Sequence, residues 1–253
     1  MVSSFYFDKG DFAPLQQDAL VLEVAALGKK AAVLLVVCDG IGGLQSGEYA
    51  SSYVTMRIRD WFYSDYLKHR KSGYGGRQME RDCVRMLYDC NRYLQCYGEE
   101  HSIRLGTTVT MALLRGRKAF GRKVFPHSVK YLILHAGDSR AYLLGKRCRR
   151  LTEDDSRGDR TLHRCIGSFP WQGVQKKRGY LWPGDRIVLC SDGFWRRLET
   201  GEIQESLGGK RRFGGNAGMS EEQMERRLRK LGETGRARGE KDNQAAVAVG
   251  AEP

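Results

Sequence analysis

The clearest pattern in the chain is a set of short apolar segments, each bounded by Gly, Asp or Ser. The segments are rich in Val, Leu and Ile, which is typical of buried β-strands. The predicted strands are Ala32–Cys38, Thr107–Leu114, Val129–Ala136, Arg140–Leu144, Ile187–Cys190 and Ala245–Val249.

Two segments between the first and second of these strands have helical spacing instead. Their apolar side chains recur on one face, as in an amphipathic helix. The first face consists of Ala50, Val54, Ile58, Trp61 and Phe62, and the second of Cys83, Met86, Leu87, Cys90, Leu94 and Tyr97. A third helix is predicted over Ser220–Leu231, where Ser220 caps and Gln223 occupies the capping-box position. This order of one strand, two long helices and a run of strands favours an α+β layer architecture over alternating βαβ units.

Two polar stretches interrupt the pattern. Thr152–Gly179 has little periodicity and predicts a long loop or flap, a kind of segment that is often functional. Ser206–Gly218 is a second, glycine-rich connection, which we expect to be mobile. No internal repeat and no long low-complexity stretch divides the 253 residues, so we expect a single domain spanning 1–253.

Composition narrows the class of protein. The longest apolar run, Ala31–Cys38, is far shorter than the roughly 18 residues that a membrane-spanning helix needs. The N-terminal residues lack the basic start and apolar stretch of a signal peptide. The seven cysteines are odd in number and include no Cys-x-x-Cys pair, which argues against a disulfide framework or a structural zinc site. We therefore expect a cytoplasmic protein.

The formal net charge of +13 includes four basic clusters, Arg115–Lys123, Lys146–Arg150, Lys176–Arg178 and Lys210–Arg212. A basic surface attracts phosphorylated or otherwise acidic partners, nucleic acid among them. Such runs are usually solvated faces, and here they are scattered and lack interleaved aromatic residues for base stacking. Nucleic-acid binding stays a minority alternative.

The candidate chemistry lies in aspartates placed at the ends of predicted strands. Asp39, Asp138 and Asp192 each follow such a strand, Asp242 precedes the last one, and Asp18 lies near the N-terminus. A single Asp-Gly after a strand is more often a turn. Several buried carboxylates together are costly unless a cation satisfies them, and an all-oxygen ligand set favours Mg²⁺ or Mn²⁺ over Zn²⁺.

Alternation along the strand that ends at Asp192 predicts that Val188, Cys190 and Asp192 share one face. A carboxylate cluster can hold two metal ions roughly 3.5–4 Å apart, and a water bridging them becomes a nucleophile near neutral pH. In-line attack on a phosphate by that water needs no Ser or Cys nucleophile.

Eight short motifs, in order, resemble those of the metal-dependent protein phosphatase 2C family, specifically its bacterial-type serine/threonine phosphatases. They are QDA at 17–19, VCDGIGG at 37–43, SGEYAS at 46–51, LGTT at 105–108, AGDSR at 136–140, LT at 151–152, CSDG at 190–193 and DN at 242–243. The resemblance runs from about residue 10 to the end of the chain.

The resemblance implies a four-layer αββα sandwich with two central, mainly antiparallel sheets. It implies that Asp18, Asp39, Asp192 and Asp242 hold two catalytic Mn²⁺ or Mg²⁺ ions, with Asp39 bridging and the Gly40 carbonyl contributing. A third, weaker ion would lie between Asp138 and Asp192. The implied activity is hydrolysis of phosphoserine and phosphothreonine in phosphoproteins, the products of a serine/threonine kinase, by a monomeric signalling enzyme that does not bind membranes.

Two positions depart from the family pattern. Family members usually carry an arginine a few residues before the first metal-binding aspartate, and it binds the substrate phosphate. This chain has Ala13, within Phe12–Leu15, in that region. A charged hydrogen bond of that kind is worth about 1.5–3 kcal/mol, so the alternative is a degenerate phosphatase that binds phosphoproteins without turnover. Ile41 replaces the histidine of animal members, as in bacterial relatives.

Four further residues have both a functional and a structural interpretation. His135 and Arg140 lie beside Asp138 in the sequence, and we expect a structural role for His135 and a structural ion pair for Arg140. Cys190 is expected to be an ordinary buried thiol. Trp171 is either an attachment of the flap or a contact for a partner.

Overall fold

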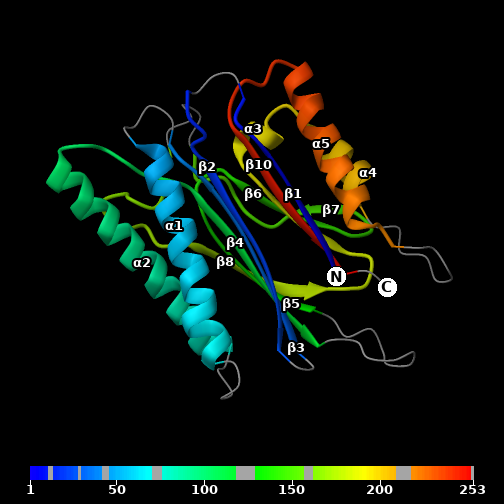
Figure 1. Ribbon diagram of the computed structural model, residues 1–253, viewed down its shortest axis with the longest axis horizontal. Helices are drawn as coiled ribbons and strands as arrows, with labels where there is room; N and C mark the ends of the chain where they lie inside the picture. Colours follow the sequence, from blue (N-terminus) through cyan, green and yellow to red (C-terminus); the bar gives the residue numbers. More distant parts are fainter. Residues whose placement is uncertain are drawn as a thin grey trace.

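Two five-stranded antiparallel sheets pack face to face in the computed structural model, with helices covering both outer surfaces (Figure 1). The structure describes residues 1–10, 14–27, 30–41, 46–69, 76–117, 129–156, 162–208 and 218–251. The expected αββα sandwich is therefore confirmed.

The first sheet has the strand order β1-β10-β9-β6-β7, and the second has the order β2-β3-β4-β5-β8. The strands of the first are β1 (Val2–Asp8), β10 (Gln244–Gly250), β9 (Arg186–Cys190), β6 (Arg140–Leu144) and β7 (Cys148–Arg150). Those of the second are β2 (Asp18–Leu27), β3 (Lys30–Asp39), β4 (Val109–Arg117), β5 (Val129–Ala136) and β8 (Gln175–Leu181).

Helices α1 (Gly47–Trp61) and α2 (Gly76–His101) cover the second sheet, and α1 continues into a short π-helix, η1 (Phe62–Leu67). Helices α3 (Asp192–Trp195), α4 (Thr200–Leu207) and α5 (Glu221–Ala237) cover the first sheet. Among the helices of the described ranges, none is long and apolar enough to cross a membrane.

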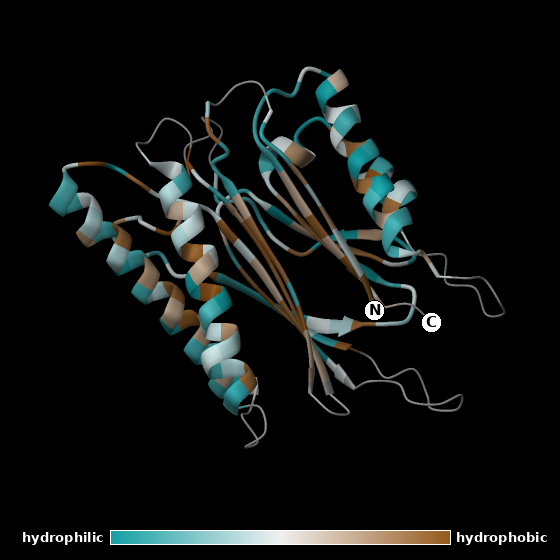
Figure 2. Ribbon diagram, viewed as in Figure 1, coloured by the Kyte–Doolittle hydropathy of each residue, from teal (hydrophilic) through white to brown (hydrophobic). Residues whose placement is uncertain are grey.

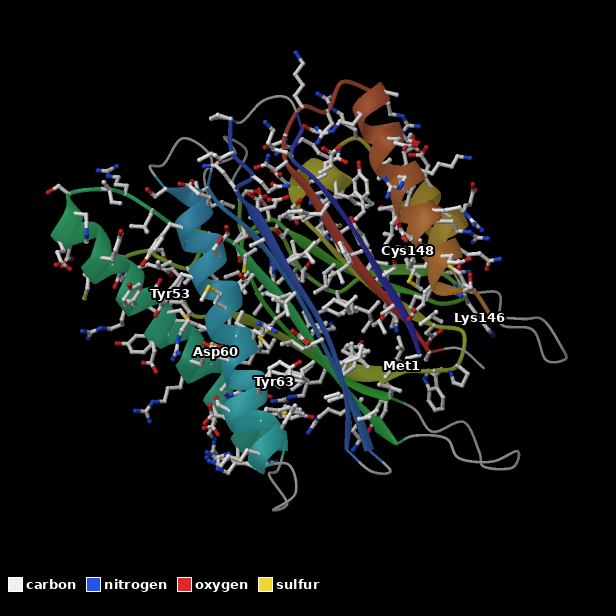
Figure 3. The ribbon with its side chains drawn as sticks, viewed as in Figure 1. Met1, Tyr53, Asp60, Tyr63, Lys146 and Cys148 are labelled. Atoms are coloured by element: carbon white, nitrogen blue, oxygen red, sulfur yellow. The ribbon has the colours of Figure 1, made fainter. Side chains whose placement is uncertain are left out.

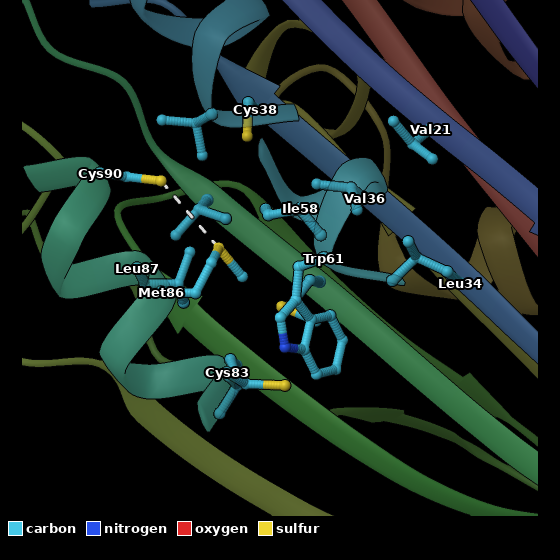
Figure 4. Close-up of a cluster of buried hydrophobic side chains, with 14 of the residues drawn as sticks. Val21, Leu34, Val36, Cys38, Ile58, Trp61, Cys83, Met86, Leu87 and Cys90 are labelled. Carbon is cyan, nitrogen blue, oxygen red and sulfur yellow. Dashed lines mark hydrogen bonds between the residues drawn. The ribbon is translucent and has the colours of Figure 1, made fainter. Parts of the chain in front are cut away.

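The side chains of strand β3 contribute to two hydrophobic clusters, one on each face of its sheet. Its side chains alternate between faces, so Val33, Leu35 and Val37 fill the space between the sheets. Leu34 and Val36 point the other way, where Figure 4 shows them facing side chains of α1 and α2. Because both faces are covered, the strand is apolar throughout, which is visible as brown ribbon in Figure 2.

All six strands predicted from the apolar pattern are present in the structure, with small differences at their ends. Three predicted helices are confirmed as well, including the capping box at Ser220 and Gln223 that starts α5. The pattern missed β1, β2, β7, β8 and the short helices α3 and α4. The predicted loop over 152–179 is shorter than expected, since its last five residues belong to β8. Most of the glycine-rich connection 206–218 lies outside the described residues.

Two basic clusters within the described residues lie on solvent-facing edges. Lys146 lies in the turn between β6 and β7, at the end of β6 away from Asp138 (Figure 3). On the edge strand β8, Lys176 and Arg178 pair with Glu80 of α2. The cluster at 210–212, and most of that at 115–123, lies outside the described residues. The two described clusters thus fit the interpretation of solvated, structural charge.

Candidate active site

Aspartates from both sheets converge at one end of the sandwich, where α1 and α3 begin (Figure 1). Asp39 is the last residue of β3 and lies opposite Asp18, the first residue of β2, in the strand register. Asp192 begins α3 directly after β9, and Asp242 lies just before β10. Asp138 lies in the turn that carries the chain from β5 in one sheet to β6 in the other.

Three of these carboxylates are close enough to share a cation. Oxygen atoms of Asp39, Asp138 and Asp192 all lie within 4.8 Å of one another. They line a cavity of about 1380 Å³, which Gly40 and Asp242 also line. The donors are all oxygens and two of the carboxylates have raised pKa values, so this group fits a hard divalent ion such as Mg²⁺ or Mn²⁺.

Hydrogen bonds from the motif at 105–108 hold the backbone of Asp39 in place. The Asp39 carbonyl accepts hydrogen bonds from the Thr108 N–H (2.8 Å) and the Thr107 hydroxyl (2.9 Å). The Thr108 hydroxyl also lies 3.0 Å from the Asp39 N–H, which donates to it. A Cβ atom on Gly40 would lie 2.4 Å from the Gly47 carbonyl oxygen, so only glycine fits where β3 passes the start of α1.

Gln17 links three elements around the same point. Its carbonyl accepts from the Gly40 N–H (3.1 Å) and from the Ser51 hydroxyl of α1 (2.6 Å). Its own N–H donates to the Asn243 side-chain oxygen at 2.7 Å. The motifs at 17–19, 37–43, 46–51 and 242–243 are therefore parts of one hydrogen-bonded unit.

Asp18 is buried behind Asp39 rather than in the cavity. Its side chain is 4% exposed and accepts a 2.7 Å hydrogen bond from the Ser191 hydroxyl, which also accepts from the Ala245 N–H at 2.9 Å. Ser191 therefore links Asp18 of the second sheet to strand β10 of the first. Asp18 is not among the residues that line the cavity.

Burial and mutual repulsion raise the pKa values of these carboxyls. Burial raises the pKa of Asp18 to about 7, and the nearby Asp242 carboxylate adds to this. Burial, then the charges of Asp18, Asp138 and Asp242, hold the pKa of Asp39 well above its usual range. The pKa of Asp138 is also raised, mainly by burial. The cluster therefore favours protons or a cation over free negative charge.

Arg196 supplies positive charge at this site and was missed by sequence reasoning. Its guanidinium contacts the Asp192 carboxylate and lies 3.6 Å from both Asp242 Oδ2 and Glu240 Oε1. Its charge lowers the pKa of Asp39, against the larger effects that raise it. The i, i+4 spacing of Asp192 and Arg196 across α3 was the available signal.

The predicted face of β9 was wrong. Val188 and Cys190 pack in the core beneath α5, whereas Asp192 lines the cavity. The reason is that β9 ends at Cys190, and Ser191 precedes α3 as its N-cap residue. Strand alternation stops before it reaches Asp192.

The other adjoining residues have structural contacts. His135 is buried, with Nδ1 2.8 Å from the Thr110 hydroxyl and Nε2 3.1 Å from the Glu153 carbonyl oxygen. Arg140 forms a two-pronged ion pair with Asp154, at 3.0 and 2.7 Å. Cys190 is fully buried, as expected. The structural interpretations of these three side chains agree with their surroundings.

The segment 162–174 is attached to the sandwich at two places. Ile166 exchanges backbone hydrogen bonds of 3.0 and 2.8 Å with Thr107, next to the Asp39 motif. Asn91 of α2 accepts from the Gly167 N–H at 2.7 Å and donates to the Ser168 carbonyl at 3.2 Å. Trp171 packs edge-on against Tyr88 of α2, with ring centroids 6.0 Å apart. Of its two interpretations, attachment of the flap is the one that these contacts support.

We expect Asn91→Ala to loosen this segment. Two hydrogen bonds are lost: the Gly167 N–H loses its acceptor, while the Ser168 carbonyl keeps its bond from Gln95, so stability should fall by about 1–2 kcal/mol. Because Gly167 and Ser168 line the cavity, KM for a phosphopeptide should rise more than KM for p-nitrophenyl phosphate. Gln78→Ala, which removes an exposed 3.0 Å hydrogen bond to Asp82 on the same helix, is the control. Equal changes in both KM values would contradict the prediction.

Gly193→Ala should disturb the site through the backbone. A Cβ atom there would lie 2.1 Å from the Asn243 carbonyl oxygen and 3.1 Å from Asp242 Cβ. We expect a loss of stability of about 1–3 kcal/mol or more, with weaker metal binding because Asp192 and Asp242 must move apart. Thermal unfolding and metal titration measure the two effects. Gly201→Ala, where nothing lies within 4 Å, should leave both unchanged or slightly improved.

Comparison with known proteins agrees with this geometry. The family model described as protein phosphatase 2C matches residues 14–231. The chain belongs to the protein phosphatase 2C family. Over 203 residues it is 26% identical to the serine/threonine phosphatase stp of Listeria monocytogenes, covering 70% of this chain and 73% of that protein.

Solved structures of phosphatases share the fold. The crystal structure of the serine/threonine phosphatase Stp1 from Staphylococcus aureus matches with a TM-score of 0.78 at 22% identity, covering all of this chain and 96% of Stp1. The catalytic domain of PstP, crystallised with two manganese ions, matches with a TM-score of 0.69 at 22% identity, covering 99% of this chain and 98% of that one. Family membership confirms the expected enzyme class, a metal-dependent protein serine/threonine phosphatase.

Proposed function

We propose that Asp18, Asp39, Asp138, Asp192 and Asp242, with the Gly40 carbonyl, hold the catalytic metal ions of this phosphatase. The observation that carries the proposal is the group of three carboxylates within 4.8 Å at the floor of the cavity. Asp39 would contribute a ligand to both catalytic ions, and Asp138 with Asp192 would hold a third, weaker one. The two manganese ions in the PstP crystal structure support this assignment.

Asp18 and Ser191 support the site through hydrogen bonds. Asp18 orients Asp39, and Ser191 orients Asp18 through its 2.7 Å hydrogen bond. Bound Mn²⁺ or Mg²⁺ would supply a nucleophilic water at neutral pH and neutralise the charge of the phosphate under attack. The chain itself supplies the fixed carboxylates, the flap that covers one side of the cavity, and the cavity in which the phosphorylated side chain sits.

Hydrolysis of p-nitrophenyl phosphate by the purified protein tests this function. We expect turnover with Mn²⁺ or Mg²⁺ and none with excess EDTA. Phosphoserine and phosphothreonine peptides should then be hydrolysed in preference to a phosphotyrosine peptide of the same sequence. Folded protein that binds these peptides without turnover in any metal would favour the alternative, a degenerate phosphatase acting as a phosphoprotein-binding module.

The proposed cellular role rests on the same phosphatase function. The whole of 1–253 forms one catalytic domain with a flap at about 152–179, and it acts as a cytoplasmic monomer in signalling. Its substrates are proteins phosphorylated by a serine/threonine kinase. All seven cysteines are unpaired, which supports a reducing compartment. Light scattering of the purified protein tests the monomer, and phosphoproteomics after its deletion tests the substrates.

A further inference from the structure

Positive charge inside the cavity comes from few residues. Among the part of the chain that the structure describes, the arginines lining the cavity are Arg104 and Arg196. Arg104 follows α2 and is exposed. Arg196 lies directly beyond α3, its side chain is 29% exposed, and it contacts Asp192. Of these two arginines, Arg196 is therefore the one that reaches the aspartates.

Other arginines near the site are committed to different partners. Arg140 is held by its two hydrogen bonds to Asp154, and its guanidinium stacks 3.1 Å from the ring centroid of Trp195. Arg236 pairs with Asp8 at 3.3 Å and donates to the Glu240 carbonyl at 3.1 Å. These contacts are structural, and neither residue lines the cavity.

Glu240 gives Arg196 a fixed position beside the metal ligands. Its side chain is buried, and its Oε1 atom accepts hydrogen bonds from the Lys241 and Asp242 N–H groups at 3.0 and 3.1 Å. The same oxygen lies 3.6 Å from Arg196. Glu240 therefore shapes the loop that carries Asp242 and attracts the guanidinium to that loop.

Cations on the aspartates would change what Arg196 binds. In the metal-free protein, the carboxylates of Asp192 and Asp242 offset the charge of Arg196. Bound cations would neutralise these carboxylates instead. Glu240 would stay as a partner, and Arg196 lines the cavity, where its guanidinium could then meet a phosphate. Guanidinium groups bind phosphate oxygens with two parallel hydrogen bonds, and such charge-assisted bonds are strong.

We propose that Arg196 binds the phosphoryl group of the substrate, and that Glu240 is its positioning residue. This inference rests on the proposed metal site. It gives the chain a phosphate-binding arginine from α3, whereas the segment before Asp18 contains none.

Phosphate affinity in the Mg²⁺-loaded enzyme tests the proposal. Arg196→Ala should raise KM for a phosphopeptide, and the dissociation constant of inorganic phosphate measured by calorimetry, by about 10- to 100-fold, because a charge-assisted interaction is lost. Arg196→Lys should recover part of the affinity, since it keeps the charge and loses the planar fork.

Arg197→Ala is the matched control. Arg197 also pairs with Glu240, at 3.8 Å, but its side chain is 52% exposed and it does not line the cavity. Its KM and phosphate affinity should stay within about twofold of wild type, a change of less than 0.5 kcal/mol. Thermal unfolding of each variant establishes that it is folded, and Arg196→Lys replaces Arg196→Ala if the alanine variant is not.

Two outcomes overturn the proposal. In one, Arg196→Ala binds phosphate like wild type while its Mg²⁺ affinity rises, and Arg196 is then only a counter-ion of the aspartates. In the other, Arg197→Ala loses as much phosphate affinity as Arg196→Ala, and the effect is general surface charge. Calorimetry needs no turnover, so an inactive wild-type enzyme would contradict the proposed function without deciding the role of Arg196.

Discussion

Asp39→Asn should lower metal-dependent turnover by at least about 1,000-fold, equivalent to about 4 kcal/mol of transition-state stabilisation. Asp39 contributes to the group of three carboxylates, and its neighbours Asp18 and Asp138 are close enough to raise its pKa. An amide at this position removes one negative charge and cannot bridge two cations. Initial rates with p-nitrophenyl phosphate across a Mn²⁺ titration measure the loss.

The same substitution should leave the fold intact. Asn has nearly the size of Asp, and the backbone hydrogen bonds from Thr107 and Thr108 to the Asp39 carbonyl do not involve its side chain. We expect the metal-free variant to unfold at a temperature equal to or above that of the wild type, because a buried repulsive charge is gone. Asp192→Asn should lose activity likewise. Asp60→Asn, on the exposed face of α1 (Figure 3), is the control and should keep full activity. Retained activity in both site variants would show that the catalytic ions lie elsewhere.

The segments predicted well from sequence are those whose burial is uniform. Strands β3 and β9 are covered on both faces, so they appear as nearly continuous apolar runs, and β5 is buried except at Lys130. Helices α1, α2 and α5 each bury one stripe and show it as helical periodicity.

The missed strands are mainly those at sheet edges. Strand β8 contains Lys176, Lys177 and Arg178 and is mostly exposed, so its sequence is hard to distinguish from a polar loop. Strand β1 exposes Phe5 and Phe7 yet buries Tyr6, which reverses the usual relation between apolarity and burial. The position of a strand at an edge is a property of the tertiary structure, and local pattern does not contain it.

The site residues also divide into those that the sequence predicts and those that it does not. The aspartates were predictable because several of them follow apolar strands, and strands of two stacked sheets end together. For Arg196 the sequence offers only its i, i+4 spacing to Asp192, because its contacts with Asp242 and Glu240 join residues more than forty positions apart. Asp18 follows no predicted strand, because β2 was missed; it lies opposite Asp39 in the strand register and does not line the cavity.

Metal removal should make the stability of the enzyme depend on pH in a defined direction. The pKa of Asp18 is about 7 in the folded protein, against an ordinary value of 3.8. The folded, metal-free protein therefore holds a proton that the unfolded chain releases above about pH 4. Since the folded state binds more protons between these values, stability should fall as pH rises from about 4 to about 7. The raised pKa of Asp39 acts in the same direction. The total loss is on the order of a few kcal/mol.

Bound Mg²⁺ or Mn²⁺ should reverse this trend. The ions compete with the protons for the aspartates, so their stabilising effect should be small near pH 5 and large near pH 8. At a free metal concentration about 100 times the dissociation constant, the gain is about 2.7 kcal/mol. Thermal unfolding across this pH range, with EDTA and with saturating Mg²⁺, measures both curves. Asp39→Asn should make the EDTA curve shallower but not flat, because the Asp39 carboxyl no longer titrates while the burial that raises the pKa of Asp18 remains. It should also remove most of the metal response, because a metal ligand is lost. Superimposable EDTA and Mg²⁺ curves for the wild type would mean that the carboxylates do not bind the ion.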